Sequence, residues 1–291
     1  MLIDLTGTNA AKINSALVSA RRSAGSPAMG MVLTLAIVTD EAAHYDALRA
    51  ATEAAREHPS RILVVVGRPG RGEPRLDAEV RIGAENGPGE VVLLRLHGAL
   101  AEHADSVVLP LLLPDAPVVT WWPSTAPESP AQDALGALAQ RRVTDAAAAP
   151  DPLAQLALRA ATYAPGDTDL SWTRLTPWRT LLAATLDEPY AEITGLEVAA
   201  EEGSSSAELL ALWLESRLGL DARRETSDGP GITSVRLRTV EGDIAVTRPD
   251  GRMAMLARPG SPDRPVALQR RSTAELIAEE LRRLDPDDVY G

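Results

Sequence analysis

Residues that could carry out catalysis are sparse in this sequence. His97 and His103 are six positions apart, which places them about 240° apart around a helix, so both imidazoles cannot bind one metal ion from one helical face. The serines at 204–206 lack the G-x-S-x-G pattern of a nucleophile elbow, and no histidine follows them in the chain to act as their base. We therefore expect no catalytic residues and no metal site.

Three glycines, Gly67, Gly70 and Gly72, follow an apolar run at the place where a dinucleotide-binding loop would begin. The fingerprint of that loop, G-x-G-x-x-G, opens a helix. Here the segment RPGRGEP at 68–74 leads instead into residues that alternate between charged and apolar, as in a strand. The pattern favours an arginine-rich turn, and we expect no bound cofactor.

The last third of the chain is rich in arginine. Between Arg217 and Arg271 there are eleven arginines and seven acidic residues, although the whole chain has a net charge of −12. Arg236 and Arg238 alternate with apolar residues, so they share one face of a predicted strand. Their guanidinium groups could bind an acidic partner or a phosphate, or they could pair with carboxylates on a solvated sheet face. The sequence leaves both alternatives open.

Tryptophan and arginine are also concentrated in the stretch from Asp169 to Arg179, which contains Trp172, Arg174 and Trp178. These two residue types dominate the energetics of protein interfaces. The stretch therefore predicts a contact, either with a protein partner or between two domains of this chain.

Composition limits the remaining possibilities. A chain of 291 residues with 45% hydrophobic content is long enough for two domains. It has no cysteine, which excludes disulfides, thiolate metal sites and a cysteine nucleophile. A net charge of −12 and a pI near 4.9 argue against nucleic acid or an anionic membrane as the main partner. The start, MLIDLTGTNAAK, has no signal-peptide pattern, so we expect a cytoplasmic protein.

The stretch from Val107 to Pro123 carries a single charge, Asp115, and indicates the centre of a core. Pro110, Pro114 and Pro117 interrupt it, so it cannot form a continuous membrane-spanning helix. Its end, 118–122, has the β-branched and aromatic content of a strand. Because neighbouring strand residues point to opposite faces, Trp121 and Trp122 cannot both enter one core. One of them should face a second layer, a cleft or a partner.

Hydrophobic periodicity predicts an N-terminal α/β domain with a mixed sheet over residues 1–165. Helices are expected from Asn9 to Arg22, from a cap at Thr39 or Asp40 to about His58, and at 98–106, 130–138 and 152–163. Strands are expected at 31–38, 61–67, 75–82, 90–96 and 118–122, and the strands 75–82 and 90–96 should be antiparallel. A short stretch at 140–143 has no assigned type.

Residues 166–291 predict a C-terminal α+β domain with an antiparallel meander and flanking helices. Thr176 is the expected N-cap of a helix that has Pro177 at its first position. A strand at 192–199 precedes a helix capped by Ser205 or Ser206. Strands at 232–240, 243–247, 252–257 and 264–269 follow, and a last helix begins at Ser272 or Thr273 and runs to about Leu284.

Three segments carry a resemblance to a known family: HPSRILVV at 58–65, LPLLLPDAPVVTWWP at 109–123 and DLSWTRLTPWRTLLA at 169–183. Together with the strand MGMVLTLAIV near the start and the arginine-bearing meander, they resemble the glucose-6-phosphate dehydrogenase assembly protein family, OpcA. The resemblance extends from end to end. Photosynthetic members are associated with cysteine-based redox control, so this chain departs from them, and thiol switching within it is excluded.

The resemblance implies a protein without catalysis of its own. It implies binding to glucose-6-phosphate dehydrogenase, promotion of the active oligomer and a supply of NADPH through the oxidative pentose phosphate pathway. The alternative from the residues is a small enzyme, or a protein that senses a sugar phosphate or nucleotide through the C-terminal arginines. The expected partner-binding residues are Arg61, Trp121, Trp122, Asp169, Trp172, Arg174, Trp178, Arg179, Arg236 and Arg238.

Overall fold

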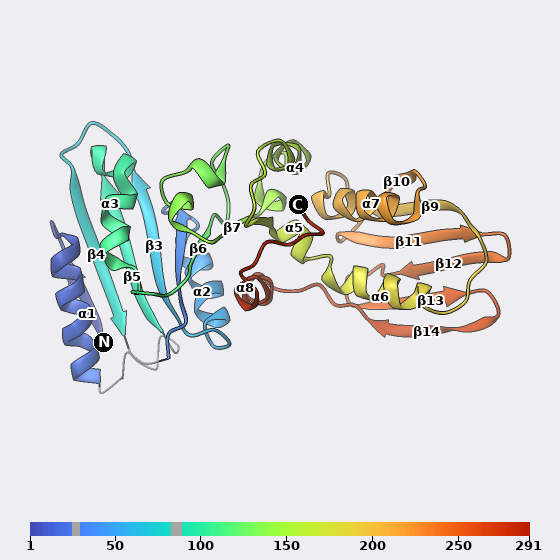
Figure 1. Ribbon diagram of the computed structural model, residues 1–291, viewed down its shortest axis with the longest axis horizontal. Coiled ribbons are helices and arrows are strands. Elements are labelled where there is room, and N and C mark those ends of the chain that lie inside the picture. The colour runs from blue at the N-terminus through green and yellow to red at the C-terminus, as the bar shows by residue number, and fades with distance from the viewer. Residues whose placement is uncertain (25–29, 83–88) are drawn as a thin grey trace. The chain divides into compact units, whose positions relative to one another are not determined.

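The computed structural model describes residues 1–24, 30–82 and 89–291, and these form two compact units (Figure 1). The first unit comprises Met1–Ala148, Leu158–Asp169 and Thr273–Gly291, and the second comprises Ala149–Ala157 and Leu170–Ser272. Mixed α/β content in one sheet, followed by a second sheet with flanking helices, confirms the predicted fold class. The boundary predicted between residues 165 and 166 stays a prediction.

The first unit is built on an eight-stranded sheet with the order β1-β4-β5-β3-β2-β6-β7-β8. The neighbours from β5 to β8 are parallel, and β4 joins β5 and β1 in antiparallel pairs, which confirms the predicted pairing of 75–82 with 90–96. The strands are β1 Leu2–Leu5, β2 Leu33–Thr39, β3 Ser60–Arg68, β4 Arg75–Ile82, β5 Glu90–His97, β6 Val118–Trp121, β7 Arg141–Thr144 and β8 Asp167–Asp169.

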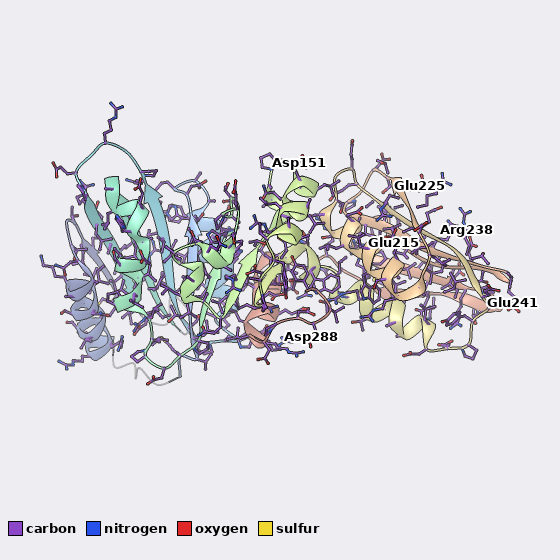
Figure 2. All side chains as sticks on the ribbon, turned by 45° about the horizontal axis from the view of Figure 1, so that its top comes forward. Asp151, Glu215, Glu225, Arg238, Glu241 and Asp288 are labelled. Carbon is purple, nitrogen blue, oxygen red and sulfur yellow. The ribbon has the colours of Figure 1, made fainter. Side chains whose placement is uncertain are left out.

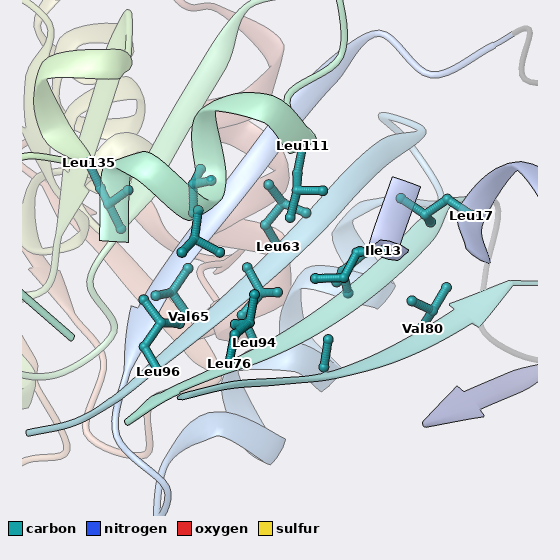
Figure 3. Close-up of a cluster of buried hydrophobic side chains, with 14 of the residues drawn as sticks. Ile13, Leu17, Leu63, Val65, Leu76, Val80, Leu94, Leu96, Leu111 and Leu135 are labelled. Carbon is teal, nitrogen blue, oxygen red and sulfur yellow. The ribbon is translucent and has the colours of Figure 1, made fainter. Parts of the chain in front are cut away.

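Helices cover both faces of the parallel strands, as strands buried on both sides require. On one face, α1 supplies Ile13 and Leu17, which pack with Leu63 of β3 and Leu94 of β5 in a fully buried cluster (Figure 3). Helix α2 packs on β2 and β3 and is in turn covered by α8, the last helix of the chain. The helices with residues in this unit are α1 Ala10–Ala24, α2 His44–Ala54, α3 Ala104–Val108, α4 Pro152–Ala161 and α8 Thr273–Arg282.

Two ion pairs neutralise buried charged side chains in the first unit. The Arg61 guanidinium, 4% exposed, donates to Glu90 Oε2 at 2.9 Å and to the carbonyl of Leu111 at 2.6 Å. Arg141 of β7 donates to Glu280 of α8 at 3.0 Å. The second pair explains why the C-terminal helix belongs to the first unit although residues 170–272 intervene.

The second unit contains a six-stranded sheet with the order β10-β9-β11-β12-β13-β14, in which only the β9–β10 pair is parallel. Helices α6 and α7 lie on one face of this sheet (Figure 1), where Val235, Leu237, Ile244 and Val246 are almost completely buried. The elements are α5 Leu170–Thr173, α6 Thr176–Leu186, β9 Ile193–Ala200, α7 Ser205–Leu218, β10 Ala222–Thr226, β11 Ile232–Thr239, β12 Gly242–Thr247, β13 Met253–Arg258 and β14 Ser261–Ala267.

Both adjacent tryptophans are buried. Trp121 ends β6 and is 1% exposed, and Trp122 is 2% exposed. The Trp122 N–H donates to the carbonyl of Val143 at 2.9 Å, so the chain stays beside β7 after the strand ends. Of the alternatives left open by the sequence, burial in two layers accounts for both side chains.

Several predicted elements are corrected by the structure. The helix expected at 130–138 is two separate 3₁₀ turns, η4 Pro130–Gln132 and η5 Gly136–Leu138, because Asp133 Oδ1 accepts the N–H groups of Leu135 and Gly136 and interrupts it. The helix expected at 98–106 is a 3₁₀ segment, η2 Gly98–His103, followed by α3.

Three predicted helix starts are also corrected. Ser204 caps α7 in place of Ser205 or Ser206, since its Oγ accepts the Ala207 N–H at 3.3 Å. Thr176 is the first residue of α6, and Leu175 occupies the cap without a side-chain bond. Helix α2 begins at His44 with Ala43 at its cap, later than the cap predicted at Thr39 or Asp40.

Replacing Glu90 by leucine should destabilise the first unit strongly, because Arg61 would remain buried and unpaired. We expect a loss of about 3 to 5 kcal/mol in the free energy of unfolding, measured by urea denaturation. Adding Arg61→Met to Glu90→Leu should recover part of that loss, because the buried Arg61 charge is removed and only the partly exposed Arg21 is left without Glu90. Glu57→Leu, which breaks the exposed pair with Arg282, is the control and should cost less than about 1 kcal/mol. Equal losses for Glu90→Leu and Glu57→Leu would contradict this account.

Candidate functional site

The order of the parallel strands defines one place where a ligand could bind. From β2 the chain proceeds through α2 to β3 and then to β5 on one side, and it later returns to β6 on the other side of β2. This is the doubly wound order, with a topological switch point between β2 and β6. In such sheets ligands bind outside the carboxyl ends of the strands at this point, and a dinucleotide places its pyrophosphate at the start of the first helix.

The backbone donors before that helix are already occupied by the chain itself. Asp40 follows β2, and its Oδ1 accepts the N–H of Ala42 at 2.9 Å and the N–H of Ala43 at 2.8 Å. The turn from Thr39 to His44 contains no glycine, whereas close approach of a pyrophosphate to the backbone depends on glycines. An aspartate carboxylate therefore occupies the donors that a phosphate would need.

Two arginines at the ends of neighbouring strands are likewise held by a carboxylate. The Glu41 carboxylate accepts a hydrogen bond from Arg95 Nε of β5 at 3.1 Å and forms an ion pair with Arg68 Nη2 of β3 at 2.7 Å. The hydrogen bond from Arg95, with further help from Arg68, lowers the pKa of Glu41 to about 2. Glu41 is thus ionised at neutral pH. The two carboxylates make this crevice unfavourable for a phosphate group by charge repulsion and by occupation of its donors.

The sequence alone did not reveal this arrangement. Asp40 was predicted only as a helix cap, and Arg68 lay in a turn considered for phosphate binding. The signal that could have found it is the pair Asp40-Glu41 directly after a buried strand, where a dinucleotide site has glycines. Among the residues that the structure describes, no group of three metal-ligating side chains could hold a metal ion.

Within the second unit, the predicted tryptophan and arginine stretch packs against itself and its own unit. The Arg179 guanidinium lies 3.7 Å from the centre of the Trp172 ring, a cation–π contact. Trp172 and Trp178 are 3% and 2% exposed. Arg271 Nη1 donates to the carbonyl of Thr173 at 3.3 Å, and Ser206 Oγ donates to the carbonyl of Ser171 at 3.0 Å.

The face of the second unit's sheet that α6 and α7 do not cover is exposed. We call it the open face; its residues include Glu197, Ser234, Arg236, Arg238, Asp243, Ala245, Thr247, Met253, Met255, Ala257, Pro265 and Ala267. One half is charged, with Arg238 extending from the sheet (Figure 2) and donating to Glu197 at 3.1 Å. The other half is apolar, with Met253 and Met255 exposed by 51% and 40%.

The ten predicted partner-binding residues are not gathered at one place on the surface. Arg61, Trp121, Trp122, Asp169, Trp172 and Trp178 are buried; Arg174, Arg179 and Arg236 are partly buried, and Arg238 is exposed. Arg236 and Arg238 share the open face, as predicted, and both lie near Glu197. The apolar half of the open face was missed, because alternation in β13 does not show which of its faces a helix covers.

Two family models match this chain. Residues 51–161 match the glucose-6-phosphate dehydrogenase subunit N-terminal domain, and residues 165–291 match the C-terminal domain of the same subunit. The chain belongs to the OpcA family. The two matches cover most of the chain and confirm the resemblance seen in its motifs.

The other comparisons do not indicate a function for this chain. No curated protein matches the chain. A crystal structure of a 3-ketoreductase from Actinomadura kijaniata with TDP-benzene and NADP is 13% identical, with 89% of this chain and 92% of that chain covered and a TM-score of 0.47. Biliverdin reductase from Synechocystis sp. PCC 6803 with biliverdin and NADP+ is 10% identical, with 86% and 88% covered and a TM-score of 0.43. Neither likeness bears on what this chain binds.

The ion pairs of Glu41 predict a pH dependence of stability. Because the folded pKa is about 2 against an ordinary 4.5, ionised Glu41 stabilises the fold above pH 4.5, and this contribution is lost as the pH falls from there towards 2. Glu41→Gln should therefore be less stable than the parent chain at neutral pH, and the difference should shrink through this range. Urea denaturation at a series of pH values measures it.

The control for Glu41→Gln is the same substitution in a chain that already carries Arg68→Gln and Arg95→Gln. In that background the glutamate has lost both partners, so its replacement should have little effect at any pH. A difference between Glu41→Gln and the parent chain that does not change with pH would contradict the assignment.

Proposed function

We propose that this protein binds glucose-6-phosphate dehydrogenase, promotes its active oligomer and raises its activity without catalysing a reaction itself. The observation that supports this most is the match of residues 51–291 to the two domains of a glucose-6-phosphate dehydrogenase subunit. In this role the protein works in the cytoplasm and contributes to NADPH supply through the oxidative pentose phosphate pathway.

The switch point of the first unit supports a role without nucleotide chemistry. A doubly wound sheet is a common scaffold for dinucleotides, yet here Asp40 and Glu41 fill the positions of the phosphate donors and partners. The scaffold is retained while its ligand site is filled by acidic side chains. Such a change fits a subunit that acts by protein contact.

We place the contact with the dehydrogenase on the open face. Its apolar half carries Met253 and Met255, and its charged half carries Arg236 and Arg238 beside Glu197. An apolar centre bordered by charged groups is typical of protein interfaces, where Met and Arg are enriched, and methionine adapts its shape to a partner. The edge strand β14 contains Pro262 and Pro265, which hinder the addition of another strand, so we expect contact through the face of the sheet.

The buried members of the predicted set then have a supporting role. Trp172 and Trp178 would hold α5 and α6 in place. Arg61, Asp169 and the two adjacent tryptophans would hold the first sheet together. Arg174 and Arg179 remain proposed contacts because they are only partly buried.

Activation of the dehydrogenase requires only a modest difference in binding energy. If the protein binds the active oligomer better than the inactive form by about 1 to 3 kcal/mol, activity changes by about 5 to 150-fold. Initial rates of the purified dehydrogenase, measured over a range of glucose 6-phosphate concentrations with and without the protein, test this. We expect a higher turnover or a lower KM, and identical rate curves at saturating protein would refute the proposal.

Titration of NADP onto the isolated protein separates this proposal from a nucleotide sensor or enzyme. Since two carboxylates occupy the phosphate positions, calorimetry should detect no binding. The double variant Asp40→Asn with Glu41→Gln lacks both carboxylates, and its affinity for NADP is compared with that of the parent chain. Tight NADP binding by the parent chain would contradict the assignment of the switch point.

The open face is tested by Met255→Glu. A charge in the apolar half should weaken the complex by about 2 kcal/mol or more, measured by calorimetry against the dehydrogenase, while the melting temperature stays close to that of the parent chain. Leu212→Glu on α7 is the control, because Leu212 is 47% exposed but lies on the helix side of the same unit. A complex unaffected by Met255→Glu would exclude this surface without excluding the function.

Trp172→Ala should affect stability, in contrast to Met255→Glu, which should affect binding. Its ring is buried under Arg179, so truncation should cost about 3 to 5 kcal/mol of stability and lower the melting temperature. A variant with normal melting but lost binding would show instead that Trp172 contacts the partner directly.

A further inference from the structure

Three segments of the second unit meet at one end of its sheet. They are 229–231, which lead into β11, 248–251, which follow β12, and 268–270, which follow β14. Arg248 links them, because its Nη2 donates to the carbonyl of Ile232 at 3.0 Å and its Nη1 to the carbonyl of Leu268 at 2.9 Å. The Arg270 N–H donates to the carbonyl of Gly251 at 2.9 Å.

Arg248 is a buried cation without a carboxylate partner. Its side chain is 5% exposed, and no carboxylate among the described residues lies within ion-pair distance of it. Its Nε–H has no hydrogen-bond acceptor, and the Trp178 ring lies 5.0 Å from the guanidinium carbon. Of the four other buried arginines, Arg61, Arg141 and Arg142 are each paired with a carboxylate, from Glu90, Glu280 and Asp167, and Arg159 donates to the carbonyl of Glu128.

A second guanidinium group borders the same point. A methyl group added to Gly231 would lie 3.7 Å from Arg248 Nη2 and 4.0 Å from Arg270 Nε. Gly231 has a φ of 63°, which favours glycine, and it is partly exposed. Outside Gly231 and its chain neighbours, no other heavy atom of the described residues lies within 4 Å of that added methyl group, so there is space beside the two guanidinium groups.

The local charge is not balanced by the protein. Burial, with repulsion from Arg270, lowers the pKa of Arg248 to about 10, so the group stays charged at neutral pH. The carboxylate that opposes this effect, Asp250, accepts the N–H groups of Arg252 and Met253 in its own turn. A buried and uncompensated charge costs several kcal/mol, and an anion bound between the two guanidinium groups would offset that cost.

We propose that Arg248 and Arg270 bind a phosphate group across Gly231. Planar guanidinium groups suit phosphate oxygens because they donate two hydrogen bonds in a fixed geometry. Arg248 contributes a buried Nε–H that has no acceptor, and Arg270, which is exposed, contributes donors from the solvent side. The phosphate can be inorganic, or it can belong to a sugar phosphate.

Calorimetric titration of the full chain tests this site. Inorganic phosphate, glucose 6-phosphate and glucose are added separately, in the millimolar range. We expect both phosphates to bind at one site and glucose to give no signal. Tighter binding of glucose 6-phosphate than of inorganic phosphate identifies a sugar phosphate as the ligand, and equal binding identifies the free anion. No heat of binding with either phosphate would overturn the proposal.

Two variants show whether these arginines are responsible. Arg270→Ala should weaken phosphate binding at least about tenfold. Arg264→Ala, which removes an exposed arginine of β14, is the matched control and should change affinity less than about twofold. Equal weakening by both variants would mean attraction to overall charge, that is, an adventitious ion only, and would overturn the proposal.

Arg248→Met separates a binding role from a structural one. The variant should lose phosphate binding and melt lower than the parent chain, because the carbonyls of Ile232 and Leu268 lose their donor, and phosphate should not change its melting temperature. In the parent chain phosphate should raise the melting temperature. A variant that melts lower, with a parent chain that does not respond to phosphate, would assign Arg248 to packing alone. The experiment needs no dehydrogenase, so its failure leaves the proposed function untouched.

Discussion

Burial of both faces of the parallel strands is the constraint on which the first unit depends. Strands β2, β3 and β5 are apolar along almost their whole length, so helices must cover both sides. The chain meets this need from distant segments, with α1 on one face and α8, from the end of the sequence, over α2. The pair between Arg141 and Glu280 links that last helix to β7, so the first unit includes the C-terminal segment Thr273–Gly291.

The same parallel arrangement brings the carboxyl ends of the strands to one edge. In many proteins this edge binds a nucleotide. Here the edge carries Asp40 and Glu41, and their partners are backbone N–H groups and the arginines of β3 and β5. The interactions that would hold a phosphate in such a site now stabilise the sheet itself. The sheet of the second unit has one covered and one open face, and the open face is the surface we propose for contact with the dehydrogenase.

Local sequence patterns predicted most helices and strands, because the pattern of apolar and polar residues in a segment largely determines whether that segment is a helix or a strand. The continuous apolar run of β3 and the alternation of β4 are readable without any partner strand. Strands β1, β8 and β10 were missed. In β8 and β10 the residues Asp167, Asp169, Arg223, Arg224 and Glu225 are unfavourable for a strand. Contacts with other elements stabilise these charged residues in a strand. Asp167 pairs with Arg142, Asp169 accepts a hydrogen bond from Thr144, and Arg224 pairs with Glu208.

The candidate sites were less predictable than the elements. That Arg236 and Arg238 share a face follows from alternation in one strand. The contacts of Glu41 with Arg68 and Arg95 depend on the order of three strands, and the closeness of Arg248 to Arg270 depends on how three turns meet. Neither can be derived from spacing along the chain. The family resemblance gave the partner, but it did not show which of the matching residues are buried.

Simultaneous measurement of assembly and activity tests the central claim most directly. Sedimentation velocity of glucose-6-phosphate dehydrogenase at fixed concentration, with increasing amounts of this protein, would give the fraction of enzyme in a larger complex, and the rate of NADPH formation would be recorded in the same mixtures. The account predicts that both quantities rise together and saturate at one ratio of the two proteins. A rate that stays constant while the complex forms, or no complex at micromolar concentrations of both proteins, would contradict it.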